Sequence, residues 1–122
     1  NSHAINPNYT KLYEDNHAPK MSKGTVIKRS PSSAYATDSA STVPLRQAAN
    51  ATKTKLQSLI MRNDIRGGMT LGPLISTNLG ISTVDIGMPQ LAMHSTRELA
   101  SLKDVEDQIR LLATIFDNYK SS

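Results

Sequence analysis

The sequence predicts an α/β fold in which helices flank a parallel or mixed sheet. Three short runs rich in β-branched or aliphatic residues alternate with helical patterns, and the last segment has a strong helical period. The 122 residues correspond to one small domain. Because only 4% of residues are aromatic and Trp is missing, the core is expected to be aliphatic and thin.

The first predicted strand follows a long polar stretch. Residues 1–24 are broken by Pro7, Pro19 and Gly24, so they are expected to form loops and turns. A loop of this length in a compact domain serves a site or packs on another part of the protein. Residues 25–28 then form a short β-branched strand.

A helix and a second strand are predicted next. Asp38 is a possible N-cap for a helix that runs through Leu45 and Ala48, and Pro44 is expected to kink or restart it. Residues 58–61 form the second predicted strand.

The middle of the chain predicts a helix between two parallel strands. Thr70 can cap a short helix with Pro73 in its first turn, and Gly80 suits a left-handed end. Residues 82–86 alternate polar and apolar side chains as a third strand. A strand, a helix and a strand within about 30 residues predict a βαβ unit with a right-handed crossover.

The C-terminal segment predicts an amphipathic helix that begins after Ser101. Its apolar residues recur at spacings of three and four, so they share one helical face that must pack against something. These residues are Leu102, Val105, Ile109, Leu112 and Phe116.

Charges support this helix, and a second helix start is predicted just before it. Asp104 suits the positive end of the helix dipole, and Glu106 and Arg110 have the spacing of an ion pair. Residues 95–98 have capping-box spacing, so a helical turn is expected directly after His94.

Composition excludes several classes of function. The absence of cysteine excludes disulfides, Cys-ligated metals and a thiol nucleophile. No apolar run approaches the roughly 20 residues of a membrane span, and no signal-peptide pattern is present, so a cytoplasmic protein without membrane contact is expected. The net charge of +4 divides into +6 over residues 1–66 and −2 over residues 67–122. Because the basic residues are spaced out and no aromatic-rich sheet motif accompanies them, nucleic acid is not an expected partner.

Candidate site residues follow the predicted strands, where open parallel sheets bind ligands. They are Lys28, residues 66–68 and residues 88–94, among which His94 is the most suggestive. A lone loop histidine is more often structural than a metal ligand, and spacing alone identifies no metal site. The glycine-rich run 67–73 could bind an anion at a helix start or could simply permit a tight turn.

Many segments of the chain resemble the C-terminal part of aspartyl aminopeptidases and occur in the family's order. The block Pro-Gln-Leu-Ala-Met-His-Ser is highly specific, and the others are moderately so. The matching segments are residues 3–9, 16–19, 23–28, 35–37, 62–64, 72–73, 84–87, 89–95 and 97–98.

The resemblance implies a function and a set of site residues. Members of this family are oligomeric dodecamers that remove acidic N-terminal residues from peptides with two zinc ions and a Glu general base. His94 matches the last zinc ligand of the family. His3, Lys28 and Tyr35 match positions that contact substrate, and Lys28 would pair with the acidic side chain.

The same resemblance implies that residues 1–122 are the C-terminal portion of a catalytic domain. The family pattern Asp-x-x-His-Ala would place a zinc-binding Asp immediately before Asn1, and the other carboxylates, including the catalytic base, would lie further upstream. No catalytic residue is therefore expected within residues 1–122, and this segment alone should be inactive. The alternative is a non-catalytic interaction module that retains the family scaffold.

Overall fold

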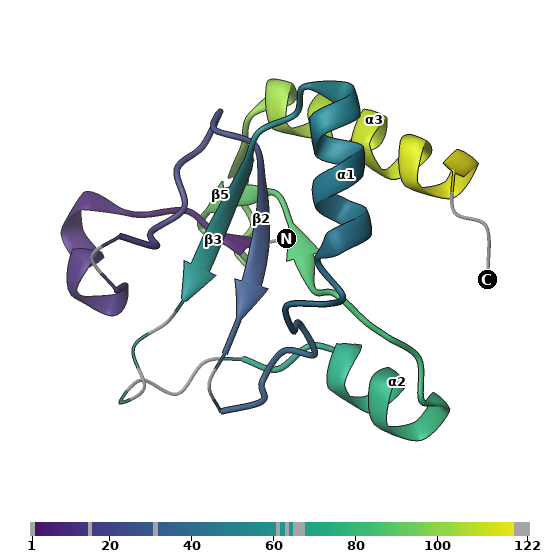
Figure 1. Cartoon of the computed structure of the whole chain (residues 1–122). Coiled ribbons are helices and arrows are strands. Elements are labelled where there is room, and N and C mark those ends of the chain that lie inside the picture. Colours follow the sequence, from purple (N-terminus) through teal and green to yellow (C-terminus); the bar gives the residue numbers. More distant parts are fainter. Residues whose placement is uncertain are drawn as a thin grey trace.

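The computed structural model describes residues 2–14, 16–30, 32–60, 62, 64 and 68–118, and it confirms the α/β class. In these residues, helices lie beside two small sheets (Figure 1). The strands are β1 (Ser2–His3), β2 (Thr25–Arg29), β3 (Leu56–Ile60), β4 (Ile86–Gly87), β5 (Pro89–Leu91) and β6 (Leu99–Ala100). The helices are the 3-10 helix η1 (Pro7–Leu12), α1 (Val43–Thr52), α2 (Gly72–Leu79) and α3 (Leu102–Asn118).

The central sheet has the strand order β3-β2-β4. β2 and β3 are parallel with Ile27 opposite Ser58, and α1 connects them, so β2-α1-β3 is the βαβ unit of this fold. The predicted unit, built on the second strand, α2 and residues 82–86, is wrong because β4 is antiparallel to β2. Only the end of the predicted third strand pairs, since β4 begins at Ile86.

The core lies on both faces of β2, because successive side chains of a strand point to opposite sides. On one face, Ile27 packs with Leu45 and Ala48 of α1 and with Leu111 of α3. On the other face, Val26 packs with Leu59 and Tyr13 of the N-terminal segment. Figure 1 shows this arrangement, with α1 and the purple N-terminal segment on opposite sides of β2 and β3. As expected, this core is largely aliphatic.

The second sheet has the order β1-β5-β6 and joins distant parts of the sequence. β1 is parallel to β5, with His3 opposite Gln90, while β5 and β6 are antiparallel. The stretch before residue 25 is therefore more ordered than the predicted loop, because it contributes both β1 and η1. This pairing brings the N-terminal segment beside the block of residues 89–95.

The helix starts differ from the predicted caps. α1 begins at Val43, so Pro44 lies in the first turn, where its missing N–H costs no hydrogen bond and causes no kink. Asp38 instead accepts a hydrogen bond from the Ser41 N–H at 2.6 Å in the preceding turn. The N-cap position of α2 is Leu71 without a side-chain cap, so the predicted cap by Thr70 is wrong.

The helix ends agree better with the sequence. Gly80 ends α2 with φ of +64°, as predicted, and its N–H donates to the Ser76 carbonyl. The helical turn predicted directly after His94 does not form, since residues 92–97 form bends and turns that lead into β6. The Glu98 side chain instead accepts a hydrogen bond from the His94 N–H, so this backbone donor is paired within the turn.

α3 packs on a different face from the predicted one. Leu102, Ile109 and Phe116 are 81%, 63% and 76% exposed, whereas Leu111 is fully buried. Asp104 explains this orientation, because its buried carboxylate accepts hydrogen bonds from the backbone N–H groups of Ser22 and Gly24. The proposed Glu106 pair is not formed, since Arg110 lies 3.8 Å from Asp107 instead. Within the described residues, no helix combines the length and the apolar character needed to cross a bilayer.

Candidate functional site

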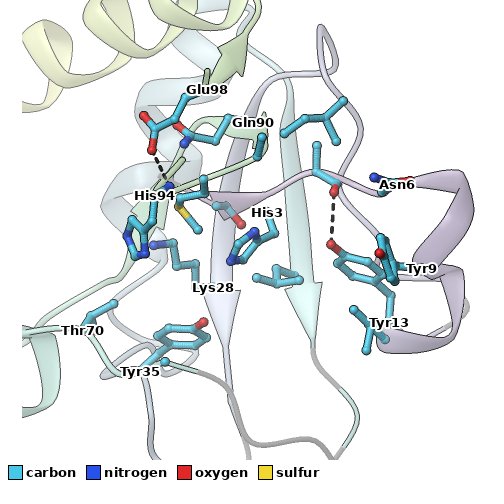
Figure 2. Close-up of a pocket in the computed structure, with 18 of the residues that line it drawn as sticks. His3, Asn6, Tyr9, Tyr13, Lys28, Tyr35, Thr70, Gln90, His94 and Glu98 are labelled. Atoms are coloured by element: carbon cyan, nitrogen blue, oxygen red, sulfur yellow. Dashed lines mark hydrogen bonds between the residues drawn. The ribbon is translucent and has the colours of Figure 1, made fainter. Parts of the chain in front are cut away.

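A cavity of about 840 Å³ lies where the two sheets meet. Its wall includes residues from β1, the end of β2, the loop at Tyr35 and the turn after β5 (Figure 2). All four residues that the sequence assigned to a site line this cavity: His3, Lys28, Tyr35 and His94. The structure thus brings together side chains that are separated by up to 91 positions in the sequence.

Lys28 is the most enclosed charged group of the cavity wall. The residue is only 9% exposed, and its Nζ lies 5.8 Å from the ring centroid of Tyr35, which is within the range of a cation–π contact. Burial lowers the pKa of Lys28, and the nearby charge of Asp85 opposes this effect. Burial also raises the pKa of Tyr35, and Asp85 raises it further. A cation held beside a neutral phenol can attract an anionic ligand group into the cavity.

His3 extends from β1 into the same cavity. Its ring is exposed to the cavity, whereas the adjacent Ser2 and Ala4 are buried, as the alternation of a strand requires. Burial lowers the pKa of His3, and the charges of His94 and Lys28 lower it further. The neutral imidazole that results can act as a hydrogen-bond donor or acceptor.

His94 lies in a strained turn after β5. Its φ is +68°, and Ala92 two residues earlier has φ of +52°. Residues other than glycine seldom adopt such a positive φ. The bond from the His94 N–H to the Glu98 Oε1, at 2.5 Å, holds the turn. Such strain is often found at binding sites, where it presents a side chain that regular structure would turn away. Figure 2 shows the His94 ring at the edge of the cavity beside Lys28.

The described residues do not form a complete metal site. No group of three or more His, Asp or Glu side chains among them is close enough to hold an ion. His94 can supply one nitrogen ligand, but a zinc ion is usually held by three or four protein ligands. The remaining ligands would have to come from chain outside the described residues.

Two buried polar side chains of the cavity were not singled out from the sequence. Gln90 and Ser2 are 2% and 1% exposed, and neither Gln90 Nε2 nor Ser2 Oγ has a hydrogen-bond partner in the described part of the chain. Gln90 belongs to the specific block of residues 89–95, which was a usable signal. Ser2 offered none, because only the pairing of β1 with β5 places it there.

The candidate segment after the second predicted strand, residues 66–68, lies only partly within the described residues. Gly68 and Thr70 line the cavity, while Arg66 and Gly67 lie outside the described residues. An anion was one possibility for the helix start that follows. The carboxylate of Asp85 lies at the start of α2. It is so close to Gly72, the first residue of the helix, that a Cβ added there would be 2.3 Å from Asp85 Oδ2. The protein's own carboxylate therefore lies beside the positive end of α2.

Comparison with known families gives a match over nearly the whole chain. Residues 1–116 match the model of the family described as aminopeptidase I zinc metalloprotease (M18). The aspartyl aminopeptidase 1 of Schizosaccharomyces pombe is 40% identical over 118 residues, which are 97% of this chain and 25% of that protein. A probable M18 family aminopeptidase 2 of Pseudomonas savastanoi is 39% identical over 98% of this chain and 28% of its own length.

Solved structures agree with this match. A cryo-EM structure of the Ape4 and Nbr1 complex superposes with a TM-score of 0.92 and 40% identity, over 96% of this chain and 22% of that chain. The yeast mApe1 dodecamer superposes with a TM-score of 0.82 and 29% identity, over 96% of this chain and 25% of that one. The chain thus spans about a quarter of the length of the relatives that it matches.

Proposed function

The chain belongs to the aminopeptidase I zinc metalloprotease (M18) family, and on this premise we propose that it forms the C-terminal portion of the catalytic domain of a zinc aminopeptidase. The complete enzyme would remove acidic residues, Asp or Glu, from the N-termini of peptides. The family match over residues 1–116 supports the peptidase activity, and relatives named aspartyl aminopeptidases support the acidic preference.

Lys28 is the observation that carries the substrate specificity in this proposal. An acidic side chain that enters the cavity would exchange hydration for a charge-assisted contact with the Lys28 ammonium. Because Lys28 is largely buried, a neutral side chain at the same place would leave its ammonium without a contact from the substrate. Tyr35 and His3 would border the same subsite and orient the substrate by hydrogen bonds.

His94 is proposed as one zinc ligand of the complete enzyme. The family description supports zinc, and we propose two ions, as the resemblance to aspartyl aminopeptidases implies. Zinc, when bound, would lower the pKa of a water molecule so that a hydroxide nucleophile is available at neutral pH. The part of the chain described here would contribute the His94 nitrogen and the substrate subsite, and the other ligands and the general base would come from the rest of the protein.

The complete protein is also proposed to be a homo-oligomer, in line with the dodecamer described for its yeast relative. The exposed apolar residues Leu102, Ile109 and Phe116 are compatible with contacts outside this segment. A cytoplasmic location and an absence of nucleic-acid partners remain predictions from composition.

A substrate panel tests this function. The complete protein would be assayed on aminoacyl substrates that begin with Asp, Glu, Ala or Leu, before and after metal removal by a chelator. We expect the Asp and Glu substrates to be hydrolysed most efficiently, with activity lost on chelation and restored by zinc. If no substrate is hydrolysed by metal-loaded protein, the alternative of a non-catalytic interaction module holds.

A further inference from the structure

Asp85 connects the segments that carry Lys28 and Tyr35. It lies directly before β4, and its backbone carbonyl accepts a hydrogen bond from the Lys28 N–H at 2.9 Å. Its backbone N–H donates to the Thr37 Oγ1 at 2.8 Å, and its Oδ2 accepts from the Ala36 N–H, also at 2.8 Å. One residue therefore holds the end of β2 on one side and the loop after Tyr35 on the other.

The Asp85 carboxylate also has a fixed place beside α2. Because a Cβ at Gly72 would lie 2.3 Å from its Oδ2, glycine at this position makes room for the carboxylate. The neighbouring Thr70 lines the cavity. Packing and hydrogen bonds thus restrict the carboxylate from two directions, and little freedom remains for it to turn toward solvent.

The charge of Asp85 acts on the two residues that it positions. It opposes the lowering of the Lys28 pKa by burial and adds to the raising of the Tyr35 pKa by burial, so at both groups it favours the protonated form. Other titratable side chains that line the same cavity include His3, Tyr35, His94 and Glu98, and the Lys28 charge adds to the lowering of the His3 pKa. The negative charge of Asp85 therefore favours the protonated Lys28 ammonium, although Asp85 itself does not line the cavity.

We propose that Asp85 is a positioning residue for substrate selectivity, which holds Lys28 and Tyr35 together so that the Lys28 ammonium faces the acidic side chain of the substrate. This inference rests on the proposed function. Asp85 does not line the cavity, so it acts through Lys28 rather than on the substrate. Its contacts reach residues 48 to 57 positions away in sequence, and no local pattern reveals them.

Asp85→Asn in the complete enzyme tests this proposal. The amide oxygen can still accept from the Ala36 N–H, so the variant removes the charge with little change of shape. We expect the ratio of kcat/KM for Asp substrates to that for Ala substrates to fall roughly three- to tenfold. Asp38→Asn is the matched control, because Asp38 also accepts a backbone N–H but lies outside the cavity wall, and the ratio should not change.

A double-mutant cycle with Lys28→Met separates this proposal from the proposed function. In the Lys28→Met background, Asp85→Asn should leave the ratio unchanged, because the group on which it acts has been removed. If Lys28→Met itself does not alter the ratio, the proposed function fails and the role of Asp85 fails with it. If Lys28→Met lowers the ratio but Asp85→Asn does not, or if the two effects simply add, only the role of Asp85 is overturned.

Thr37→Val provides a second variant in case Asp85→Asn does not fold. It removes the hydroxyl that accepts the Asp85 N–H and keeps a similar side-chain volume. A smaller fall of the same ratio is expected, with kcat/KM for Ala substrates retained. An equal loss of activity on acidic and neutral substrates would indicate a purely structural effect and would contradict the proposal.

Discussion

His94 adopts a backbone conformation that few residues other than glycine adopt, and this strain points to a role beyond packing. Regular β-structure after β5 would alternate the side chains along a strand, whereas the turn at residues 92–97 presents the His94 ring at the cavity edge. The bond from its N–H to Glu98 compensates part of the cost. We interpret the turn as a structure that places the His94 imidazole at the edge of the cavity.

Replacement of His94 by Ala in the complete protein tests the zinc assignment. We expect loss of bound zinc and of peptide hydrolysis, because a site that loses one of its few ligands binds the ion much more weakly. Zinc content per protomer, measured by elemental analysis beside the rate, is the readout. His17→Ala is the control, since His17 pairs with Glu14 and does not line the cavity. A His94→Ala protein with unchanged zinc content and rate would exclude His94 as a ligand.

Individual site residues were predictable where they follow a predicted strand, as Lys28 and His94 do, or where the chain matches a family segment. The block of residues 89–95 indicated His94, and the resemblance indicated His3, Lys28 and Tyr35, all of which line one cavity. Their individual roles stay predictions. Asp85 and Ser2 were not identified, because their places depend on bonds and strand pairs between segments far apart in sequence.

At the scale of elements, the sequence pattern predicted where helices and strands form better than it predicted which of them pack or pair together. The strand at residues 25–28, the helix at Leu45 and the C-terminal helix all form, but the βαβ unit uses β2, α1 and β3. The spacing of apolar residues predicts which side chains share one face of a helix, but it does not predict which face packs against the rest of the fold. In α3 three of the five residues of the predicted apolar face are exposed, because Asp104 and Leu111 determine the orientation.

Asp104→Ala should therefore destabilise the fold more than other changes near the start of α3. It would leave the buried N–H group of Gly24 and the partly buried N–H group of Ser22 without their acceptor, which costs about 2–4 kcal/mol. Thermal or denaturant unfolding of the complete protein measures the loss. Glu106→Ala on the exposed side of α3 is the control and should change the free energy of unfolding by less than about 0.5 kcal/mol. Equal stabilities of the two variants would show that Asp104 does not anchor α3.

At the scale of the whole molecule, the described residues have a small core and much uncovered apolar surface. α2 and its flanks expose Met69, Leu71 and Leu79, each by more than 60%, and α3 adds its own apolar stripe. Composition predicted the thin aliphatic core. It could not predict how much of the apolar surface would stay uncovered, because that depends on tertiary packing.

We expect the isolated 122-residue chain to be inactive and poorly protected. Its described residues hold no group of three possible metal ligands, and its exposed apolar surface leaves few buried contacts to resist local opening. Hydrogen exchange and an assay on an Asp substrate with added zinc check both parts. Cooperative unfolding as a protected monomer would refute the structural part, and turnover would refute the catalytic part.

The central claim is that this chain supplies the acidic-substrate subsite of an aminopeptidase through Lys28. The most direct test is the ratio of kcat/KM for Asp to Ala substrates in the complete enzyme and in Lys28→Met, which keeps most of the side-chain volume and removes the charge. We predict a fall of roughly ten- to a hundredfold in this ratio, the value of one charge-assisted contact. Lys20→Met, an exposed lysine outside the cavity wall, should leave it unchanged. An unchanged ratio in Lys28→Met would contradict the account.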